Sequence, residues 1–323
     1  MIALVTGATG LIGNAIVRLL VEGEHKVRAL VRDPERAAHC LPALVERVRG
    51  DVTDSASLAQ AVRGVEWVFH AAGLPEQWQR DESIFDRVNR QGTRNLLEAA
   101  HAAGVRRVIY TSTMDVFAAP RGGTLVETNL DAQPKHTAYE RSKQAAEREA
   151  EKVRAQGLEV VYVNPAAVYG PSPVAGSLNG FFVRLLTGKI PMLPPGGLSI
   201  AYVDGVAAMH LAAAERGHSG ERYLLADTHV SNTALARAIV LEAGLRKVPP
   251  TAPGWLVGGL ATVSAPLARW FRFRPLIAPG ELTFLRWDVR VDATKARREL
   301  GFQPTALAQG VARTVSFFQS ARP

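Results

Sequence analysis

Short apolar runs alternate along the first half of the chain with longer stretches that mix apolar and polar residues. The short runs are continuous and rich in Val and Ile, which is typical of strands that are buried on both faces. They predict strands at residues 2–6, 26–31, 45–49, 66–71, 106–112 and 158–164. The longer stretches repeat their apolar residues with helical spacing, notably at residues 11–23, 82–103 and 137–156.

This alternation of strand and helix predicts an α/β protein with a doubly wound parallel sheet. Neighbouring parallel strands need crossover connections, which are usually helices, and these helices cover both faces of the sheet. We therefore predict that residues 1–165 form one domain of this type.

The regular alternation stops after Pro165. Residues 169–180 are typical of a loop, and residues 190–199 are dense in Pro and Gly, which interrupt regular structure. Helices are predicted at residues 204–216, 231–243, 253–271, 293–300 and 305–319, and one strand is predicted at 221–226. Residues 166–323 are therefore predicted to form a smaller, mostly helical region that is interleaved with the first and returns some segments to its sheet.

Composition narrows the class of protein. The 323 residues include 47% hydrophobic and 21% charged residues, enough apolar material for a sizeable core. The net charge is +8, but the Lys and Arg residues are spread along the chain, without charged tracts or zinc-finger spacing. This pattern argues against nucleic acid as a partner and favours a basic surface that attracts an anionic ligand.

The single cysteine, Cys40, rules out an internal disulfide, and no metal-ligand cluster surrounds it. The chain starts directly with a strand pattern, so we expect no signal peptide and a cytoplasmic protein. Residues 253–270 approach the length of a membrane span, but prolines and glycines interrupt them. We expect a buried or interfacial helix there rather than a membrane span.

A glycine-rich turn follows the first predicted strand. In "TGATGLIG", Gly7, Gly10 and Gly13 recur at every third position and lead into a helix. Such a turn lets backbone N–H groups approach a pyrophosphate, which the positive end of the helix dipole also attracts. The spacing differs from the common GxGxxG fingerprint.

A tyrosine and a lysine lie four residues apart in "HTAYERSKQAAERE". Tyr139 and Lys143 are neighbours on a helix, so this spacing fits either an acid/base pair or two polar residues on a solvated face. The stretch alone does not separate these alternatives.

Taken together, these motifs resemble the extended short-chain dehydrogenase/reductase superfamily. "GDVTD" (50–54), "HAAG" (70–73), "VNRQGTRNLLEAA" (88–100), "SIAYVDGVAAMHLAA" (199–213) and "DATKARRELGFQP" (292–304) are similar to further segments of this family. The resemblance covers nearly the whole chain and favours the catalytic interpretation of Tyr139 and Lys143. Within the family, the chain looks closest to the dihydroflavonol 4-reductase and 3β-hydroxysteroid dehydrogenase branch.

The resemblance implies a nicotinamide cofactor and a set of residues around it. Asp51 and Val52 correspond to the pair that contacts adenine, and Asn89 to a family asparagine. The implied cofactor site comprises Gly7, Thr9, Gly10, Leu11, Ile12, Arg32, Asp51, Val52, Ala71, Ala72, Gly73, Tyr139, Lys143, Pro165 and Val168.

The implied chemistry is hydride transfer coupled to proton transfer at a carbinol oxygen. A tyrosine with its ordinary pKa near 10 is a poor base at neutral pH, but the positive charge of Lys143 lowers that pKa. Thr111, Ser112 and Thr113 offer a third catalytic group at the end of the fifth strand. The family pattern assigns the catalytic hydroxyl to Thr113 and the preceding position to Ser112, and it leaves open which hydroxyl polarises the substrate.

The end of the second predicted strand indicates the form of the cofactor. An acidic residue there would bind the ribose hydroxyls of NAD(H), but this chain has Val31 followed by Arg32. An arginine at this position pairs with a 2′-phosphate, so we predict NADP(H) in preference to NAD(H). The alternative is that Arg32 is a surface residue and that Asp33 caps a helix starting at Pro34.

The substrate is predicted to be a largely apolar small molecule. Members of the family that act on nucleotide sugars usually carry an arginine near the position of Leu198. Dehydratases carry two acidic residues after the catalytic threonine. This chain has Met114 at the first of these positions and keeps an acidic residue, Asp115, at the second. Residues 180–186 and 255–273 are apolar enough to line such a pocket or simply to be core. Arg184 and Arg286 are the residues that could still supply cations to it. A nucleotide-sugar epimerase or dehydratase is the alternative, and a non-catalytic dinucleotide sensor is a third. The resemblance also implies a homodimer formed through helices 82–103 and 137–156.

Overall fold

The computed structural model describes residues 1–75, 79–172, 177–254 and 287–320. Nearly all of the helix predicted at 253–271, the whole apolar stretch 255–273 and Arg286 lie outside these residues. Among the described residues, none of the helices is both long and apolar enough to cross a bilayer.

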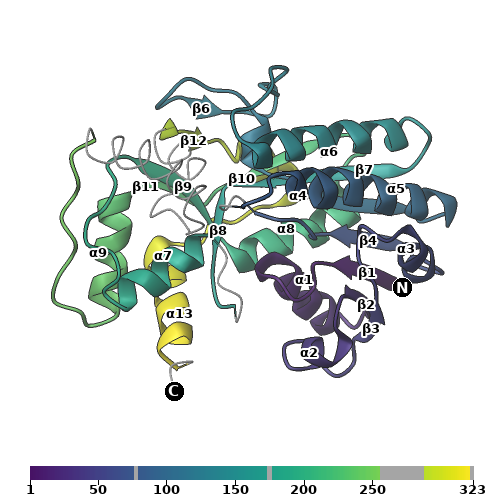
Figure 1. Cartoon of the computed structure of the whole chain (residues 1–323), viewed down its shortest axis with the longest axis horizontal. Coiled ribbons are helices and arrows are strands. Elements are labelled where there is room, and N and C mark those ends of the chain that lie inside the picture. Colours follow the sequence, from purple (N-terminus) through teal and green to yellow (C-terminus); the bar gives the residue numbers. More distant parts are fainter. Residues whose placement is uncertain (76–78, 173–176, 255–286, 321–323) are drawn as a thin grey trace.

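A seven-stranded sheet forms the centre of the molecule (Figure 1). Its strands follow the order β10-β7-β5-β4-β1-β2-β3, and all neighbours are parallel. The strands are β1 (Ile2–Thr6), β2 (Lys26–Val31), β3 (Glu46–Arg49), β4 (Trp67–His70), β5 (Arg107–Thr111), β7 (Glu159–Pro165) and β10 (Arg222–Leu225). The predicted doubly wound parallel sheet is therefore confirmed, and β10 comes from the second half of the chain.

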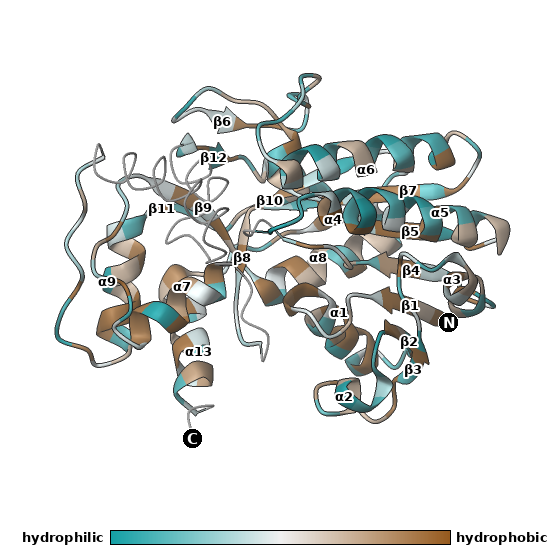
Figure 2. Ribbon diagram, viewed as in Figure 1, coloured by the Kyte–Doolittle hydropathy of each residue, from teal (hydrophilic) through white to brown (hydrophobic). Residues whose placement is uncertain are grey.

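Helices cover both faces of this sheet, as its apolar strands require. The helices α1 (Leu11–Glu22), α8 (Val203–Arg216) and α12 (Thr294–Leu300) pack on one face. The helices α3 (Ser55–Ala61), α5 (Gly92–Ala102) and α6 (Ala138–Arg154) pack on the other. Figure 2 shows the apolar strands between helices whose polar residues face outward. Along β1, Ala3 and Val5 belong to the first core and Leu4 to the second, as the alternation of side chains along a strand requires.

The helix predicted at 82–103 forms with an irregularity in its course. It begins as α4 (Ser83–Phe85), passes through a π-helical segment at Asp86–Gln91 and continues as α5. Such π-segments frequently occur at functional sites. Asn89 lies within this one and is buried.

A second, smaller lobe stands at the left of Figure 1. It contains the three-stranded sheet of β11 (Thr228–Ser231), β9 (Gly197–Tyr202) and β8 (Ala167–Tyr169), and a two-stranded pairing of β12 (Arg290–Val291) with β6 (Thr124–Leu125) lies near it. The helices α7 (Ser177–Leu186), α9 (Asn232–Glu242) and α13 (Leu307–Ser320) complete it. Tyr169, Phe182 and Tyr202 lie at its core.

The lobe is mostly helical, as predicted, but it holds strands that the sequence pattern did not reveal. Only the strand at 221–226 was predicted there, and it forms as β10 in the main sheet. The missed strands are short, and β9 directly follows a segment rich in Pro and Gly. Their residues are buried by packing against helices from distant parts of the chain, which local periodicity does not report.

Candidate active site

A large cleft opens at the carboxyl ends of the parallel strands, between the two lobes. Its volume is about 1630 Å³, and the segments that follow β1, β2, β4, β5 and β7 all contribute to its wall. In open α/β sheets this is the edge at which ligands bind, because the loops there converge.

The predicted cofactor residues come together in this cleft. Fourteen of the fifteen line its wall: Gly7, Thr9, Gly10, Leu11, Ile12, Arg32, Asp51, Val52, Ala71, Ala72, Gly73, Tyr139, Pro165 and Val168. Lys143 does not line the wall, because its side chain lies beneath the surface, with 6% of the residue exposed.

The glycine turn leaves no room for side chains. Gly7 has a φ of 68°, and a Cβ atom there would lie 2.6 Å from the backbone of Ala71. A Cβ on Gly13 would lie 2.2 Å from the carbonyl oxygen of Gly7. Helix α1 begins after Gly10 without a side-chain cap, so its first N–H groups face the cleft end of the turn. This cradle of backbone fits a pyrophosphate.

Helix α6 carries Tyr139 in its first turn. Thr137 and Glu140 form a capping box that fixes where the helix begins. Tyr139 lines the cleft, and the edge of its ring packs against Phe85 with a centroid distance of 6.1 Å. The tyrosine is therefore held by both the helix start and the segment at α4.

Lys143 lies one turn further along α6 and is buried. Its Nζ donates hydrogen bonds of 2.8 Å to the Tyr110 hydroxyl and of 2.8 Å to the Thr111 carbonyl oxygen. Burial lowers the pKa of Lys143 to about 8, although Glu147 and Asp115 act against this shift. Near neutral pH the side chain is still mostly an ammonium group.

The three hydroxyls at the end of β5 have different surroundings. Thr111 shares a hydrogen bond of 2.8 Å with His210, and it does not line the cleft. The Ser112 hydroxyl is buried and finds no hydrogen-bond partner within the described parts of the chain, although the residue belongs to the cleft wall. The Thr113 hydroxyl donates a hydrogen bond of 2.7 Å to an Asp115 carboxylate oxygen. Sequence reasoning noted Asp115 but did not foresee this bond.

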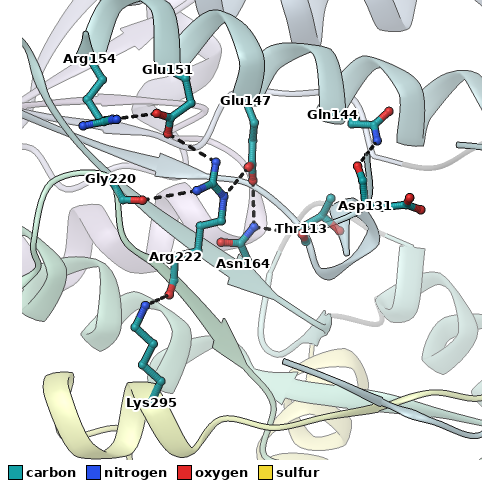
Figure 3. A network of polar contacts seen from close by, with 10 residues as sticks. All are labelled: Thr113, Asp131, Gln144, Glu147, Glu151, Arg154, Asn164, Gly220, Arg222 and Lys295. Atoms are coloured by element: carbon teal, nitrogen blue, oxygen red, sulfur yellow. Dashed lines mark hydrogen bonds and ion pairs between the residues drawn. The ribbon is translucent and has the colours of Figure 1, made fainter. Parts of the chain in front are cut away.

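The main chain at Thr113 is tied to the far edge of the sheet (Figure 3). Asn164 donates to the Thr113 carbonyl oxygen over 3.1 Å and to the Glu147 carboxylate over 3.0 Å. The other carboxylate oxygen of Glu147 accepts a bond of 2.7 Å from Arg222 on β10. The sequence offered no signal for this network, because its members lie far apart along the chain.

Asn89 joins three segments at the base of the cleft. Its side chain accepts a hydrogen bond from the Leu74 N–H and donates to the Leu74 carbonyl oxygen. It also donates a bond of 2.9 Å to the Ser142 hydroxyl on α6. The π-helical segment therefore fixes the loop after β4 relative to the helix that carries Tyr139.

Two arginines lie at the other end of the cleft. Arg32 and Arg36 both belong to its wall, next to Asp51 and Val52. The Asp33 side chain accepts a hydrogen bond from the Arg36 N–H and caps α2 (Pro34–Ala38), as the alternative interpretation of this segment predicted. The cap and the position of Arg32 in the cleft wall are compatible.

The wall contributed by the second lobe is predominantly apolar. It includes Leu178, Phe181, Ile190, Met192, Leu193, Leu198 and Leu235. Arg184 on α7 and Lys189 after it also belong to this wall. Sequence reasoning had named Arg184 as a possible cation for the pocket but had not noticed Lys189.

Comparisons with known proteins identify the family of the chain. Residues 3–226 match the family described as NAD dependent epimerase/dehydratase family. Sterol demethylase protein B of Methylococcus capsulatus is 33% identical over 99% of this chain and 98% of its own length. A putative dihydroflavonol 4-reductase of Synechocystis is 32% identical over 98% of this chain and 94% of its own. Human 3 beta-hydroxysteroid dehydrogenase type 7 is 30% identical over 99% of this chain and 96% of its own length.

A solved structure extends the comparison to a sugar-modifying enzyme. The dTDP-glucose 4,6-dehydratase DesIV of Streptomyces venezuelae, with NAD and TYD bound, has a TM-score of 0.80 to this chain. It is 26% identical and covers 100% of this chain and 98% of its own. The predicted resemblance is confirmed at the level of the family, and the similar proteins include a putative dihydroflavonol 4-reductase and a 3 beta-hydroxysteroid dehydrogenase as well as a sugar-nucleotide dehydratase.

Proposed function

The chain belongs to the NAD dependent epimerase/dehydratase family, and we propose that it transfers a hydride between a nicotinamide cofactor and a carbonyl or secondary alcohol of a largely apolar substrate. One observation carries this proposal. The glycine turn, Tyr139 and Thr113 line one continuous cleft, and the wall that the second lobe contributes to it is predominantly apolar. The sterol- and dihydroflavonol-named relatives support the same substrate class.

The residues of this chain have separate tasks in the proposed reaction. When bound, the cofactor supplies or accepts the hydride. Tyr139 gives a proton to the substrate oxygen during reduction or takes it during oxidation. The ammonium group of Lys143 stabilises the tyrosinate, because a nearby positive charge lowers the pKa of a phenol. Ser112 and Thr113 provide hydroxyls for a hydrogen bond to the same oxygen.

We propose that the cofactor is NADP(H) rather than NAD(H). A 2′-phosphate carries negative charge, and Arg32 and Arg36 both line the end of the cleft that holds Asp51 and Val52. A fluorescence titration with NADPH and NADH measures the preference directly. We expect Arg32→Ala to weaken the binding of NADPH at least tenfold more than the binding of NADH. Equal weakening of the binding of both cofactors would contradict the assignment.

The apolar wall supports the proposed substrate class energetically. Burying an apolar ring system gains about 25 cal/mol for each Å² removed from water. A diphosphate buried without cationic partners would cost several kcal/mol. The discriminating experiment is a screen of NADPH oxidation across aromatic aldehydes, flavanonols, steroid ketones and nucleotide sugars.

A nucleotide-sugar epimerase or dehydratase is the second candidate, and one observation favours it. Arg184 and Lys189 lie in the wall of the cleft, so the substrate side is not free of cations. Titration with UDP and with a steroid ketone, each in the presence of NADP(H), separates the two candidates. Micromolar affinity for UDP without any response to the ketone would favour the sugar enzyme.

The catalytic assignment has its own test. Tyr139→Phe removes the acid/base and is expected to abolish turnover while NADPH binding persists. Near-native turnover would exclude the assignment, and NADPH binding without turnover in the unaltered protein would indicate a dinucleotide sensor instead. Thr113→Ala is expected to lower turnover roughly 10- to 1000-fold. A larger loss in Ser112→Ala would make Ser112 the catalytic hydroxyl.

We also propose a homodimer through the helices around α5 and α6, on the basis of the family resemblance. These helices pack against each other, and Arg90 pairs with Glu149 between them at 3.6 Å. Light scattering at micromolar concentration tests the assembly, and a mass near 34.8 kDa would indicate a monomer.

A further inference from the structure

A buried carboxyl group lies next to the proposed catalytic hydroxyl. Asp115 belongs to the cleft wall, and 8% of the residue is exposed. One of its carboxylate oxygens accepts a hydrogen bond of 2.7 Å from the Thr113 hydroxyl, and the other is buried without a hydrogen-bond partner among the residues that the structure describes. Its backbone N–H donates a weaker bond of 3.3 Å to the Thr113 hydroxyl oxygen.

This arrangement constrains what Thr113 can do. A threonine hydroxyl has one proton to donate and two lone pairs that accept. While Asp115 is ionised it takes that proton, and Thr113 can only accept a hydrogen bond from the substrate. A protonated carboxyl group has an O–H of its own. It can donate to Thr113, whose proton then becomes available to the substrate.

Hydride transfer in either direction passes through the same transition state, in which negative charge gathers on the substrate oxygen and a hydrogen-bond donor stabilises it. We propose that Asp115 determines whether Thr113 can donate to that oxygen, so that turnover in both directions is faster when Asp115 is protonated and slower when it is ionised. This inference rests on the proposed function and makes Asp115 a positioning residue, since it acts through Thr113.

The surroundings of Asp115 bring its titration into the working pH range. Burial raises the pKa of Asp115 to about 6, and the Thr113 hydroxyl bond opposes this rise. Glu140 on α6 raises the pKa further, while Lys135 before that helix and Lys143 within it lower it. Tyr139 is the other titratable group of the same part of the cleft wall.

The coupling can be measured without turnover. The infrared difference between the unaltered protein and Asp115→Asn isolates the carboxyl band of residue 115, which can be followed from pH 4 to 8. The same difference in a Thr113→Val background reports Asp115 without its hydroxyl donor. We expect a higher pKa in that background, because a hydrogen bond to the carboxylate favours the charged form. An identical pKa in both backgrounds would overturn the proposal.

A second experiment measures kcat/KM for carbonyl reduction and for alcohol oxidation from pH 5 to 8. In both directions, kcat/KM of the unaltered protein relative to that of Asp115→Leu is expected to fall through pH 6 by up to about a hundredfold, the effect of losing one positioned donor. Asp115→Asn and Asp115→Leu should both lose this step. A step near pH 6 that persists in either variant, or that Ser112→Ala removes, would overturn the proposal.

Asp227 provides a matched control. Its carboxyl group is half-buried and its pKa is also raised by burial, but it accepts hydrogen bonds from the Tyr202 and Thr305 N–H groups and does not line the cleft. Asp227→Asn should leave the pH profile of kcat/KM unchanged. If this variant lost the step near pH 6, the proposal would be overturned. If the unaltered protein turns over no carbonyl or alcohol, the proposed function fails, and the infrared titration still decides whether Asp115 and Thr113 are coupled.

Discussion

Replacing Arg222 should destabilise the protein far more than replacing an arginine in an exposed ion pair. Glu147 is 3% exposed, and its two carboxylate oxygens accept from Asn164 at 3.0 Å and from Arg222 at 2.7 Å. Arg222→Met keeps most of the apolar volume of the side chain but removes the compensating charge. The buried carboxylate then retains only a neutral amide donor.

The structure sets the size of this effect. Removing one partner of a buried ion pair typically costs 3–5 kcal/mol, because the other charge stays buried without compensation. The Arg222 side chain is 16% exposed, so water can partly replace it. We therefore expect a loss of about 3 kcal/mol in the free energy of unfolding, at the lower end of that range. Arg154→Met is the control: Arg154 pairs with Glu151 at 2.8 Å, but both side chains are about a third exposed, so the cost is about 0–1 kcal/mol.

Equilibrium urea unfolding, followed by tryptophan fluorescence, measures both variants. Adding Glu147→Gln to Arg222→Met removes the uncompensated charge and should recover most of the lost stability. A loss below about 1 kcal/mol, or one equal to that of Arg154→Met, would refute the reasoning that burial makes this pair different. A double variant as unstable as the single one would show that Arg222 contributes through packing instead.

Three further predictions concern the cleft. Gly13→Ala should abolish NADPH binding in a fluorescence titration, because its Cβ would lie 2.2 Å from the carbonyl oxygen of Gly7. Gly180→Ala is the control and should bind NADPH normally, because a Cβ there would meet no described atom within 4 Å. Tyr110→Phe should lower the pKa of Lys143 below its value of about 8, because the ammonium group loses a hydrogen-bond acceptor. The pH profile of turnover measures this pKa, and a profile that does not shift would contradict the prediction. The pKa of Asp115 rises from 3.8 to about 6 on folding, so stability from this group is present below pH 4 and is lost as pH rises through 6. Relative to the unaltered protein, Asp115→Asn should therefore gain roughly 3 kcal/mol between pH 4 and 7, and a pH-independent difference would exclude this.

Local sequence was sufficient for the parallel half of the fold. Most of the strands there are largely apolar runs, so each one can be recognised without knowledge of its neighbours. Gly197–Tyr202 is different: all six residues of this strand are buried, yet it follows Pro and Gly residues that indicate a loop. Its place in a sheet depends on pairing with Thr228–Ser231 and Ala167–Tyr169, which lie about 30 residues away on either side.

The candidate site shows the same division between local and distant information. Tyr139 and Lys143 are recognisable because their spacing of one helical turn occurs together with the glycine-rich turn and the other segments that resemble the family. The partner of Lys143 is not recognisable, since Tyr110 lies 33 residues away along the chain. Asp115 is only two residues from Thr113, but the hydrogen bond between them matters because both residues are buried. Burial is a property of the folded molecule and cannot be read from these neighbouring positions in the sequence.

The network at Thr113 also bears on how the two predicted regions depend on each other. Arg222 belongs to the second region by sequence, yet its strand completes the sheet of the first beside β7. Through Glu147 and Asn164 it reaches the backbone carbonyl of Thr113, where the proposed catalytic hydroxyl begins (Figure 3). Lys295 donates to the Arg222 carbonyl oxygen from α12, which adds a third part of the chain. Because these contacts converge on one loop, the geometry of the proposed catalytic hydroxyl depends on segments that are far from any motif in the sequence.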